Sequence, residues 1–199
     1  MRLVPTASRL SEDGAAIARS LQHPETFANV FDRHFAFVYR YVARRAGRDR
    51  ADDVASQTFT VAFAHRGRYR DDLGTARPWL LGIATNLLRA EHRNDQRLML
   101  TVDRLGHEAV VSSSRSALAV ASTDRDDDSR LSNALAQLDP GQRDALLLHA
   151  LGELSYAEIA AAMEIPIGTV RSRISRACAV LRTELEPPAS VAGPRRNHA

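Results

Sequence analysis

The stretch LSYAEIAAAMEIPIGTVRSRISRACAVLR, residues 154–182, decides the fold class of this chain. Ser155 followed three residues later by Glu158 forms a capping box, which is the signature of a helix start and predicts a short helix. Residues 164–166 then predict a turn before a second helix at about 167–185, which two prolines end. Two short helices joined by a tight turn, the second rich in Arg, are typical of a helix-turn-helix.

The second helix of this motif is expected to separate apolar from basic side chains. Its apolar residues recur every three or four positions and should face the domain core: Val170, Ile174, Ala177 and Leu181. The opposite face carries the candidate DNA contacts Arg171, Ser172, Ser175 and Arg176, with Arg173 between the faces, where phosphate is a better partner than a base. Residues 166–182 hold four Arg and no acid, whereas a face that simply meets solvent usually alternates Glu with Arg. This pattern favours DNA contact, with Arg171 and Ser172 deepest in the major groove.

Helical periodicity continues through most of the chain, so an all-α fold is predicted. Three helices are expected in the first half, at residues 27–47, about 49–65 and 79–97, and two more at 131–138 and 140–152 precede the helix-turn-helix. One face of the helix at 49–65 is formed by Val54, Thr58, Val61 and Ala62. The buried stripe of the helix at 79–97 is expected to be Leu80, Ile83, Leu87 and Ala90.

Residues 98–130 differ from the sequence on both sides and are interpreted as a linker. They contain a run of Ser at 112–114, a run of Asp at 126–128 and little helical periodicity. The chain is therefore expected to form two small helical domains joined by a flexible linker. The expected divisions are an N-terminal extension at 1–24, a first domain at 25–97, the linker at 98–130, a second domain at 131–187 and a disordered tail at 188–199.

The 199 residues have an ordinary globular composition but an uneven charge distribution. All 27 basic residues are Arg, and residues 27–97 hold 13 of them against 8 acids, although the net charge of the chain is only +3. Such local concentrations favour a polyanionic partner, which the net charge alone would not. No apolar run is long enough to span a bilayer, and residues 1–19 lack an apolar signal core, so we expect no membrane association and a cytoplasmic location.

The sequence carries no signal of catalysis, cofactor binding or metal binding. It has no Gly-rich phosphate loop and no His-Glu pair at the helical spacing of a metal site. The seven His are scattered, and His34 and His149 are expected to have structural roles within helices. The single Cys178 excludes an intramolecular disulfide and is expected to be a small buried hydrophobe. We therefore predict no catalytic residue, no metal site and no cofactor.

Three stretches together resemble sigma-70-type RNA polymerase sigma factors of the extracytoplasmic-function (ECF) subfamily. Residues 154–182 resemble the fourth conserved region of that family, with GTVRSRISRA as a specific signal. ARPWLLGIATNLLRAEHR at 76–93 and DDVASQTFTVAF at 52–63 resemble its second region. The matches occur in the family's order and cover about residues 25–97 and 131–185.

The resemblance implies a transcription initiation factor without chemistry of its own. Such proteins bind core RNA polymerase, recognise and open the −10 promoter element with the second region and bind the −35 element with the fourth. The −35 contacts implied by the resemblance are the basic face described above. For the −10 element it implies that Asn86 lies beside the pocket for a flipped base, where an amide can both donate and accept hydrogen bonds.

The resemblance also implies a contact with a coiled coil of the largest polymerase subunit. The residues concerned are Asp53, Val54, Gln57 and Thr58. This chain departs from the family's commonest pattern, because Ser56 replaces a frequent Gln and Gln57 replaces a frequent acid. Which of these residues dominates polymerase binding is therefore left open.

Several residues near the −10 assignment allow a second interpretation. Asn86 could instead hydrogen-bond within the helix bundle, and Trp79 could be a core anchor in place of a stacking platform for single-stranded DNA. Arg89 and Arg93 lie four residues apart on one helix face, which suits phosphate contact or simple exposure beside Glu91 and Asp95.

Further expectations concern partners and competing functions. The resemblance implies a chain that is monomeric when free of polymerase and is held inactive by an anti-sigma factor. It also implies a linker that permits a closed and an extended arrangement of the domains. A different class, a helix-turn-helix regulator that binds operators without recruiting polymerase, would need a dimer or an effector domain, and residues 27–97 resemble neither. An enzyme is the third and least favoured class.

Overall fold

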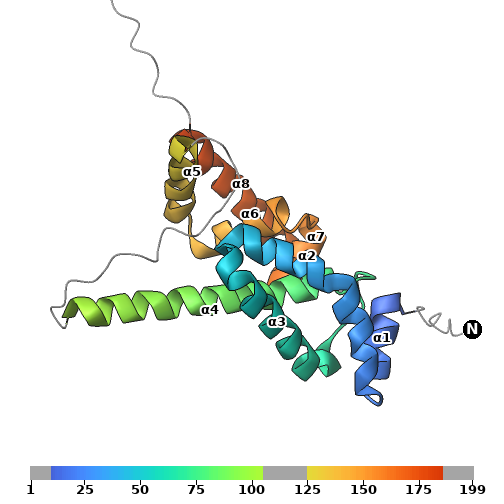
Figure 1. Ribbon diagram of the computed structural model, residues 1–199. Coiled ribbons are helices and arrows are strands. Elements are labelled where there is room, and N and C mark those ends of the chain that lie inside the picture. The colour runs from blue at the N-terminus through green and yellow to red at the C-terminus, as the bar shows by residue number, and fades with distance from the viewer. Residues whose placement is uncertain (1–9, 105–124, 186–199) are drawn as a thin grey trace, which may run out of the picture.

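The computed structural model describes residues 10–104 and 125–185, in which helices alternate with short turns and no strand occurs (Figure 1). The α-helices are α1 Glu12–Ser20, α2 Ala28–Ala46, α3 Arg48–His65, α4 Arg77–Arg104, α5 Arg125–Gln137, α6 Pro140–Ala150, α7 Tyr156–Met163 and α8 Ile167–Leu185. Short 3-10 helices follow α1 at Pro24–Phe27 and α3 at Arg66–Arg68. The predicted all-α class with two helical domains is confirmed.

The first domain is a bundle in which α2, α3 and α4 pack on one another, with α1 against one end of α2 (Figure 1). A single residue, Gly47, joins α2 to α3, and its φ of 88° lies in the left-handed region that glycine adopts without a steric penalty. This residue lets the chain reverse at once, so that α3 packs along α2. The sequence had placed the stop of the first helix at this glycine.

Helix α4 buries a different stripe from the one predicted. The buried residues are Leu80, Leu81, Ala84, Thr85 and Leu88, whereas Ile83, Leu87 and Ala90 are only partly buried. The reason is that α4 has neighbours on two sides, with α2 and α3 on one side and α7 of the second domain on another. The predicted stripe assumed a surface helix with one buried face. That assumption underestimates how much of a helix is buried when it has neighbours on two sides.

Helix α1 is anchored by a buried carboxylate. Asp13 is 4% exposed and accepts hydrogen bonds from Nε2 of His34 at 2.7 Å and from the backbone amide of Ala76 at 2.8 Å, and it also pairs with Arg33. Burial alone would raise the pKa of the Asp13 carboxyl, but the hydrogen bonds and charges of Ala76, His34 and Arg33 outweigh it and lower that pKa. The structural role predicted for His34 is confirmed.

The first domain should lose stability as the pH falls below neutrality, because His34 is buried. Burial lowers the pKa of His34, and Arg77 and Arg33 lower it further, against the opposing effect of Asp13. The unfolded chain therefore binds a proton at a higher pH than the folded chain, and stability rises with pH across that interval. We expect the unfolding temperature, followed by circular dichroism, to fall from about pH 7.5 to about pH 5.5. His34→Gln, which keeps a donor for Asp13, should flatten this dependence, whereas the exposed His23→Gln should retain it.

The second domain forms from α5 to α8, with the predicted caps in place. The Asp139 side chain accepts from the Gly141 amide at 2.8 Å to start α6, and Ser155 and Glu158 form both bonds of the capping box that starts α7. Glu164, at φ 53°, makes the left-handed turn into α8. The helix-turn-helix predicted from residues 154–182 is therefore confirmed in its elements.

The sequence predicted a structural role for His149 and a buried position for Cys178, both in the second domain. His149 is held through a 2.9 Å contact between Nδ1 and the Leu154 carbonyl, which confirms its structural role. Cys178 is exposed, so the expectation of a buried thiol is wrong. In α8 the buried positions are Val170, Ile174 and Ala177, and Cys178 lies one residue beyond that row.

Helices extend into both ends of the expected linker at 98–130. Helix α4 continues to Arg104, since residues 98–104 contain neither Gly nor Pro, and α5 begins at Arg125. Residues 126–128 fall in the first turn of α5. The middle of the linker and the predicted tail lie outside the described residues.

The two domains share one continuous hydrophobic core. Val170, Ile174, Ile159 and Leu148 of the second domain belong to the same buried cluster as the residues of α2, α3 and α4. The domains approach closely at Gly82 of α4, where an added Cβ would collide with the Ala162 carbonyl at the end of α7. A glycine at this position lets the two backbones touch.

Candidate nucleic-acid interface

Helix α8 has the two opposing faces that its sequence predicts. Val170, Ile174 and Ala177 are 0%, 5% and 0% exposed, while Arg171 and Arg176 project into solvent. Ser175 is exposed on the same side as the two arginines. These three residues form a basic face, called here the α8 basic face, that is open to a polyanion.

The remaining two predicted contacts of α8 are less open. Ser172 is half-buried and its hydroxyl donates to the Thr169 carbonyl at 3.0 Å. Arg173 is also half-buried and lies against the start of α6, since a Cβ on Gly141 would be 2.9 Å from its Cζ. The intermediate position predicted for Arg173 is therefore present in the structure.

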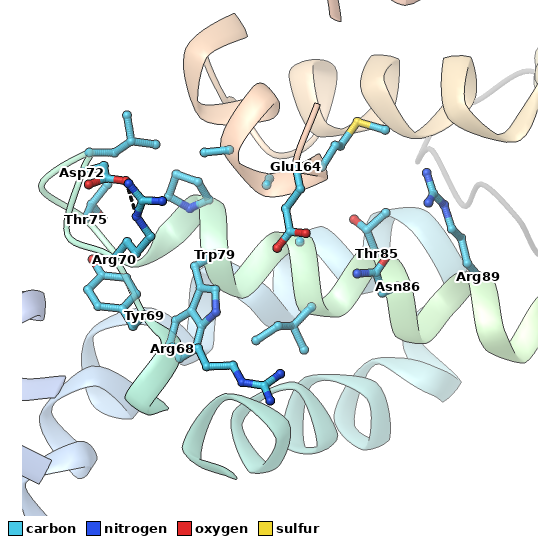
Figure 2. Close-up of a pocket in the computed structure, with 17 residues that line it drawn as sticks. Arg68, Tyr69, Arg70, Asp72, Thr75, Trp79, Thr85, Asn86, Arg89 and Glu164 are labelled. Carbon is cyan, nitrogen blue, oxygen red and sulfur yellow. Dashed lines mark ion pairs between the residues drawn. The ribbon is translucent and has the colours of Figure 1, made fainter. Parts of the chain in front are cut away.

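A cavity of about 530 Å³ lies between the first domain and the end of α7 (Figure 2). The loop at 68–75 and helix α4 form most of its wall, and residues 161–164 of the second domain close one side. Three residues predicted for −10 recognition, Trp79, Asn86 and Arg89, line this cavity. Arg93 is exposed farther along α4 and does not line it. We call this space the α4 cavity.

One end of the α4 cavity is aromatic. The rings of Tyr69 and Trp79 lie 5.1 Å apart between centroids, and Figure 2 shows them side by side. Trp79 also packs against the buried cluster, as the core role considered from the sequence predicts, and it lines the cavity as well. Burial raises the pKa of Tyr69, and the nearby Asp71 raises it further, so the hydroxyl stays protonated and donates to Asp71 at 3.1 Å.

Asn86 is an exposed residue of α4 on the wall of the cavity. Figure 2 shows its amide next to Thr85, on the stretch of α4 between Trp79 and Arg89. Its side chain therefore faces a space large enough for a planar group, with an aromatic surface at one end.

Arg89 has a partner that the sequence did not predict. Asp144 of α6 is 2% exposed and pairs with both Arg89 and Arg45 of the first domain. Arg45 also donates to the Tyr41 hydroxyl at 2.7 Å. The signal was an acid in the buried row of α6, where Asp144 precedes Leu148 by one helical turn. This buried ionic group connects the two domains.

The helix predicted to bind polymerase exposes only part of the predicted set. Asp53 and Gln57 are exposed, but Val54 and Thr58 are 1% and 0% exposed, and the Thr58 hydroxyl donates to the Val54 carbonyl at 2.7 Å. Val54 and Thr58 are one helical turn apart and face the core, as the periodicity indicated, so their assignment as direct contacts is corrected. The exposed face of α3 comprises Asp52, Asp53, Ser56, Gln57 and Thr60.

Two acids of α4 extend this exposed face, although the sequence analysis did not place them on it. Glu91 and Asp95 line a second cavity of about 330 Å³ together with Asp53, and both lie within salt-bridge distance of Arg50, at 3.8 and 3.2 Å. Burial raises the pKa of Glu91, and Asp95 and Asp53 raise it while Arg50 opposes them. The arrangement is an acidic surface built from two helices.

With this geometry established, comparison with known proteins decides the family. Residues 30–98 match the family model for sigma-70 region 2, and residues 128–181 match that for sigma-70, region 4. The chain belongs to the sigma-70 family. This sigma factor therefore directs RNA polymerase to specific promoters at the start of transcription.

Individual relatives place it in the ECF subfamily. It is 33% identical over 150 residues to the ECF RNA polymerase sigma factor SigC of Mycobacterium tuberculosis, covering 75% of this chain and 78% of that one. It is 32% identical over 167 residues to the RNA polymerase sigma factor CarQ of Myxococcus xanthus, covering 79% and 88%. Its fold is similar to that of the sigma factor RpoE of Bartonella quintana, solved in complex with the anti-sigma factor NepR, with a TM-score of 0.53, 26% identity and coverage of 82% and 96%.

Across residues 10–104 and 125–185, no helix combines the length and apolarity needed to cross a bilayer. Within the same ranges, no three His, Cys, Asp or Glu side chains gather into a potential metal site.

Proposed function

We propose that this sigma factor reads its promoters with two separate surfaces. The α4 cavity receives a flipped base of the −10 element, and the α8 basic face reads the −35 element in the major groove. The observation that supports the −10 assignment is the combination of an aromatic pair, Tyr69 and Trp79, with the Asn86 amide around one cavity. Stacking on aromatic rings and edge hydrogen bonds compensate for the cost of removing a base from its stack.

Polymerase docking is assigned to the acidic surface of α3 and α4. Asp53 and Gln57 are exposed on α3, and Glu91 and Asp95 continue the surface on α4. Such a surface complements a basic coiled coil in the largest polymerase subunit, and complementary charge would steer the encounter. In this proposal all chemistry is performed by polymerase, and the chain itself carries no catalytic residue.

The described arrangement of the domains is proposed to be a closed one. Residues 161–164 form part of the α4 cavity wall, and Figure 2 shows the Glu164 carboxylate reaching toward α4 between Trp79 and Thr85. A nucleic-acid base in this cavity would have to share it with this carboxylate and the end of α7. The domains must therefore separate before the −10 element can enter, and an anti-sigma factor would be a partner that keeps the free, monomeric chain inactive.

Transcription in vitro tests the proposal without knowledge of the natural promoter. A duplex library with randomised −10 and −35 blocks is transcribed by bacterial core RNA polymerase with and without this chain, and the transcripts are sequenced. Enrichment of defined −10 and −35 sequences only in the presence of the chain supports the proposal. DNA binding without any effect on initiation would favour the operator-binding regulator instead.

Asn86→Ala should change the preference at one −10 position in that library. An amide that reads a base edge contributes about 1–3 kcal/mol of discrimination, so the preferred base at this position should lose most of its advantage. The −35 preferences should not change, because α8 is untouched. Asn133→Ala, an exposed Asn on α5, is the matched control. An unchanged −10 profile would make Asn86 a structural residue.

A further inference from the structure

Helix α1 and the loop that lines the α4 cavity are joined by hydrogen bonds at both ends of the loop. At one end, both oxygens of Asp71 accept from Ser11, one from its backbone amide and one from its hydroxyl, each at 2.5 Å. The Ser11 hydroxyl in turn accepts from the Gly14 amide at 2.9 Å, as the N-cap of α1. A side chain at Gly14 would collide with the Asp71 carboxylate, so the loop lies directly on the first turn of α1.

At the other end of the loop the hydrogen bond runs in the opposite direction, because the loop supplies the donor and α1 supplies the acceptor. Asp13 accepts from the backbone amide of Ala76 at 2.8 Å, with the Thr75 hydroxyl 3.4 Å away. The Ala76 carbonyl accepts the first hydrogen bond of α4, from Leu80 at 2.9 Å. Asp13 therefore fixes the point at which the cavity-lining helix begins.

The Asp13 carboxylate is itself rigidly held. It is 4% exposed, and Arg33 and His34 of α2 occupy its other hydrogen-bonding positions. An acceptor on α1 that two residues of α2 also hold defines the position of the Ala76 amide more closely than a side chain on a surface loop could.

The loop that these two anchors hold carries part of the wall of the cavity. Tyr69 donates to Asp71 at 3.1 Å while its ring lies 5.1 Å from that of Trp79, so the Asp71 anchor also orients the aromatic end. Thr75 lines the cavity beside the Asp13 anchor. Each anchoring carboxylate therefore also contacts a residue of the cavity wall: Asp71 contacts Tyr69, and Asp13 contacts Thr75.

We infer that α1 is a positioning element for −10 recognition, with Asp13 and Asp71 as positioning residues that hold the loop at 69–75 in its base-receiving shape. This inference rests on the proposed role of the α4 cavity. A loop ordered in advance does not lose conformational freedom when a base binds, so the anchors raise the strength of −10 recognition without touching DNA. The helix lies before the residues 30–98 that match sigma-70 region 2.

The test uses the holoenzyme formed from the full chain and bacterial core polymerase, with the randomised promoter library as the probe. Asp13→Ala and Asp71→Ala each cut one anchor. Glu12→Ala is the matched control, since Glu12 is the neighbouring acid of α1, pairs with the same Arg33 at 3.1 Å and is 86% exposed. Asp13→Asn keeps one oxygen for the Ala76 amide and serves where the alanine variant folds poorly. Folding is checked by circular dichroism.

We expect both alanine variants to reduce −10 preferences about tenfold, the size of effect that a residue coupled to a site without touching the ligand can produce. The −35 preferences and polymerase affinity should stay at wild-type values, Glu12→Ala should match wild type, and Asp13→Asn should lie between. A purely structural role would instead lower −10 and −35 preferences together, and that outcome would overturn the inference.

The comparison with Asn86→Ala separates this inference from the function on which it rests. If Asn86→Ala changes the −10 profile while folded Asp13→Ala and Asp71→Ala do not, the positioning role is wrong and the cavity assignment survives. If Asn86→Ala also leaves the −10 profile unchanged, the cavity is not the −10 site and both ideas fall.

Discussion

Replacing Asp144 with Asn is expected to separate the two domains of the free protein. Asp144 is the carboxylate between Arg45 and Arg89, and its side chain is 3% exposed, against 10% for Arg45 and 31% for Arg89. Removing one partner from a buried ionic group costs about 3–5 kcal/mol, because the opposite charges are left without compensation. Opening the interface lets both arginines regain water, so the closed arrangement should lose most of its advantage.

Small-angle X-ray scattering of the free chain measures this opening as an increase in the radius of gyration. The helical signal in circular dichroism should be unchanged, because the Asp144 carboxylate pairs with arginines of the first domain and the substitution leaves the backbone of α6 intact. Glu153→Gln removes an exposed acid of the same domain and should leave the radius at its wild-type value. An Asp144→Asn protein as compact as wild type would show that apolar contacts alone hold the domains together.

Replacing Arg171 or Arg176 with Ala is expected to weaken −35 recognition strongly. Both side chains are exposed on the α8 basic face, and a bidentate contact between Arg and guanine contributes about 1–3 kcal/mol of discrimination. If either arginine instead contacts phosphate, binding should weaken for all sequences. The slope of the logarithm of the binding constant against the logarithm of the salt concentration should then become shallower by about one. The sequence preference therefore tells the two kinds of contact apart.

The measurement is duplex binding to −35 variants at several salt concentrations, with polymerase affinity determined in parallel. Arg182→Ala lies on the same helix near its C-terminal end and controls for the loss of one positive charge. Polymerase affinity should be equal in all variants, because the proposed docking surface lies on α3 and α4. Loss of polymerase binding in a folded Arg176→Ala protein would contradict the assignment of this face.

Local signals in the sequence predicted the individual helices well. The capping box at Ser155 and Glu158, the cap at Asp139 and the stop at Gly47 all depend on residues within one turn, and all three are present. The faces of α8 followed from spacing alone for the same reason. For Val54 and Thr58 the spacing correctly indicated a buried face, and the family resemblance misled the site assignment.

Long-range pairings could not be predicted from the same signals. Asp144 is separated in sequence from its partners Arg45 and Arg89 by 99 and 55 residues. Asp13 is separated from Ala76 by 63 residues. Each partner has the polar character of an ordinary surface residue, and only the packing of distant helices buries it. The stripe of α4 was misjudged on the same ground, since its second neighbour, α7, belongs to the other domain.

Arg89 pairs with Asp144 and lines the α4 cavity, so in the proposed −10 complex promoter phosphates would compete with one of the chain's own carboxylates for it. The apparent affinity of the free protein for DNA is its intrinsic affinity multiplied by the fraction of molecules that are open. A closed form favoured about a hundredfold would therefore weaken solitary DNA binding about a hundredfold. Polymerase, by holding the domains apart, would restore the full affinity and so couple promoter occupancy to holoenzyme assembly.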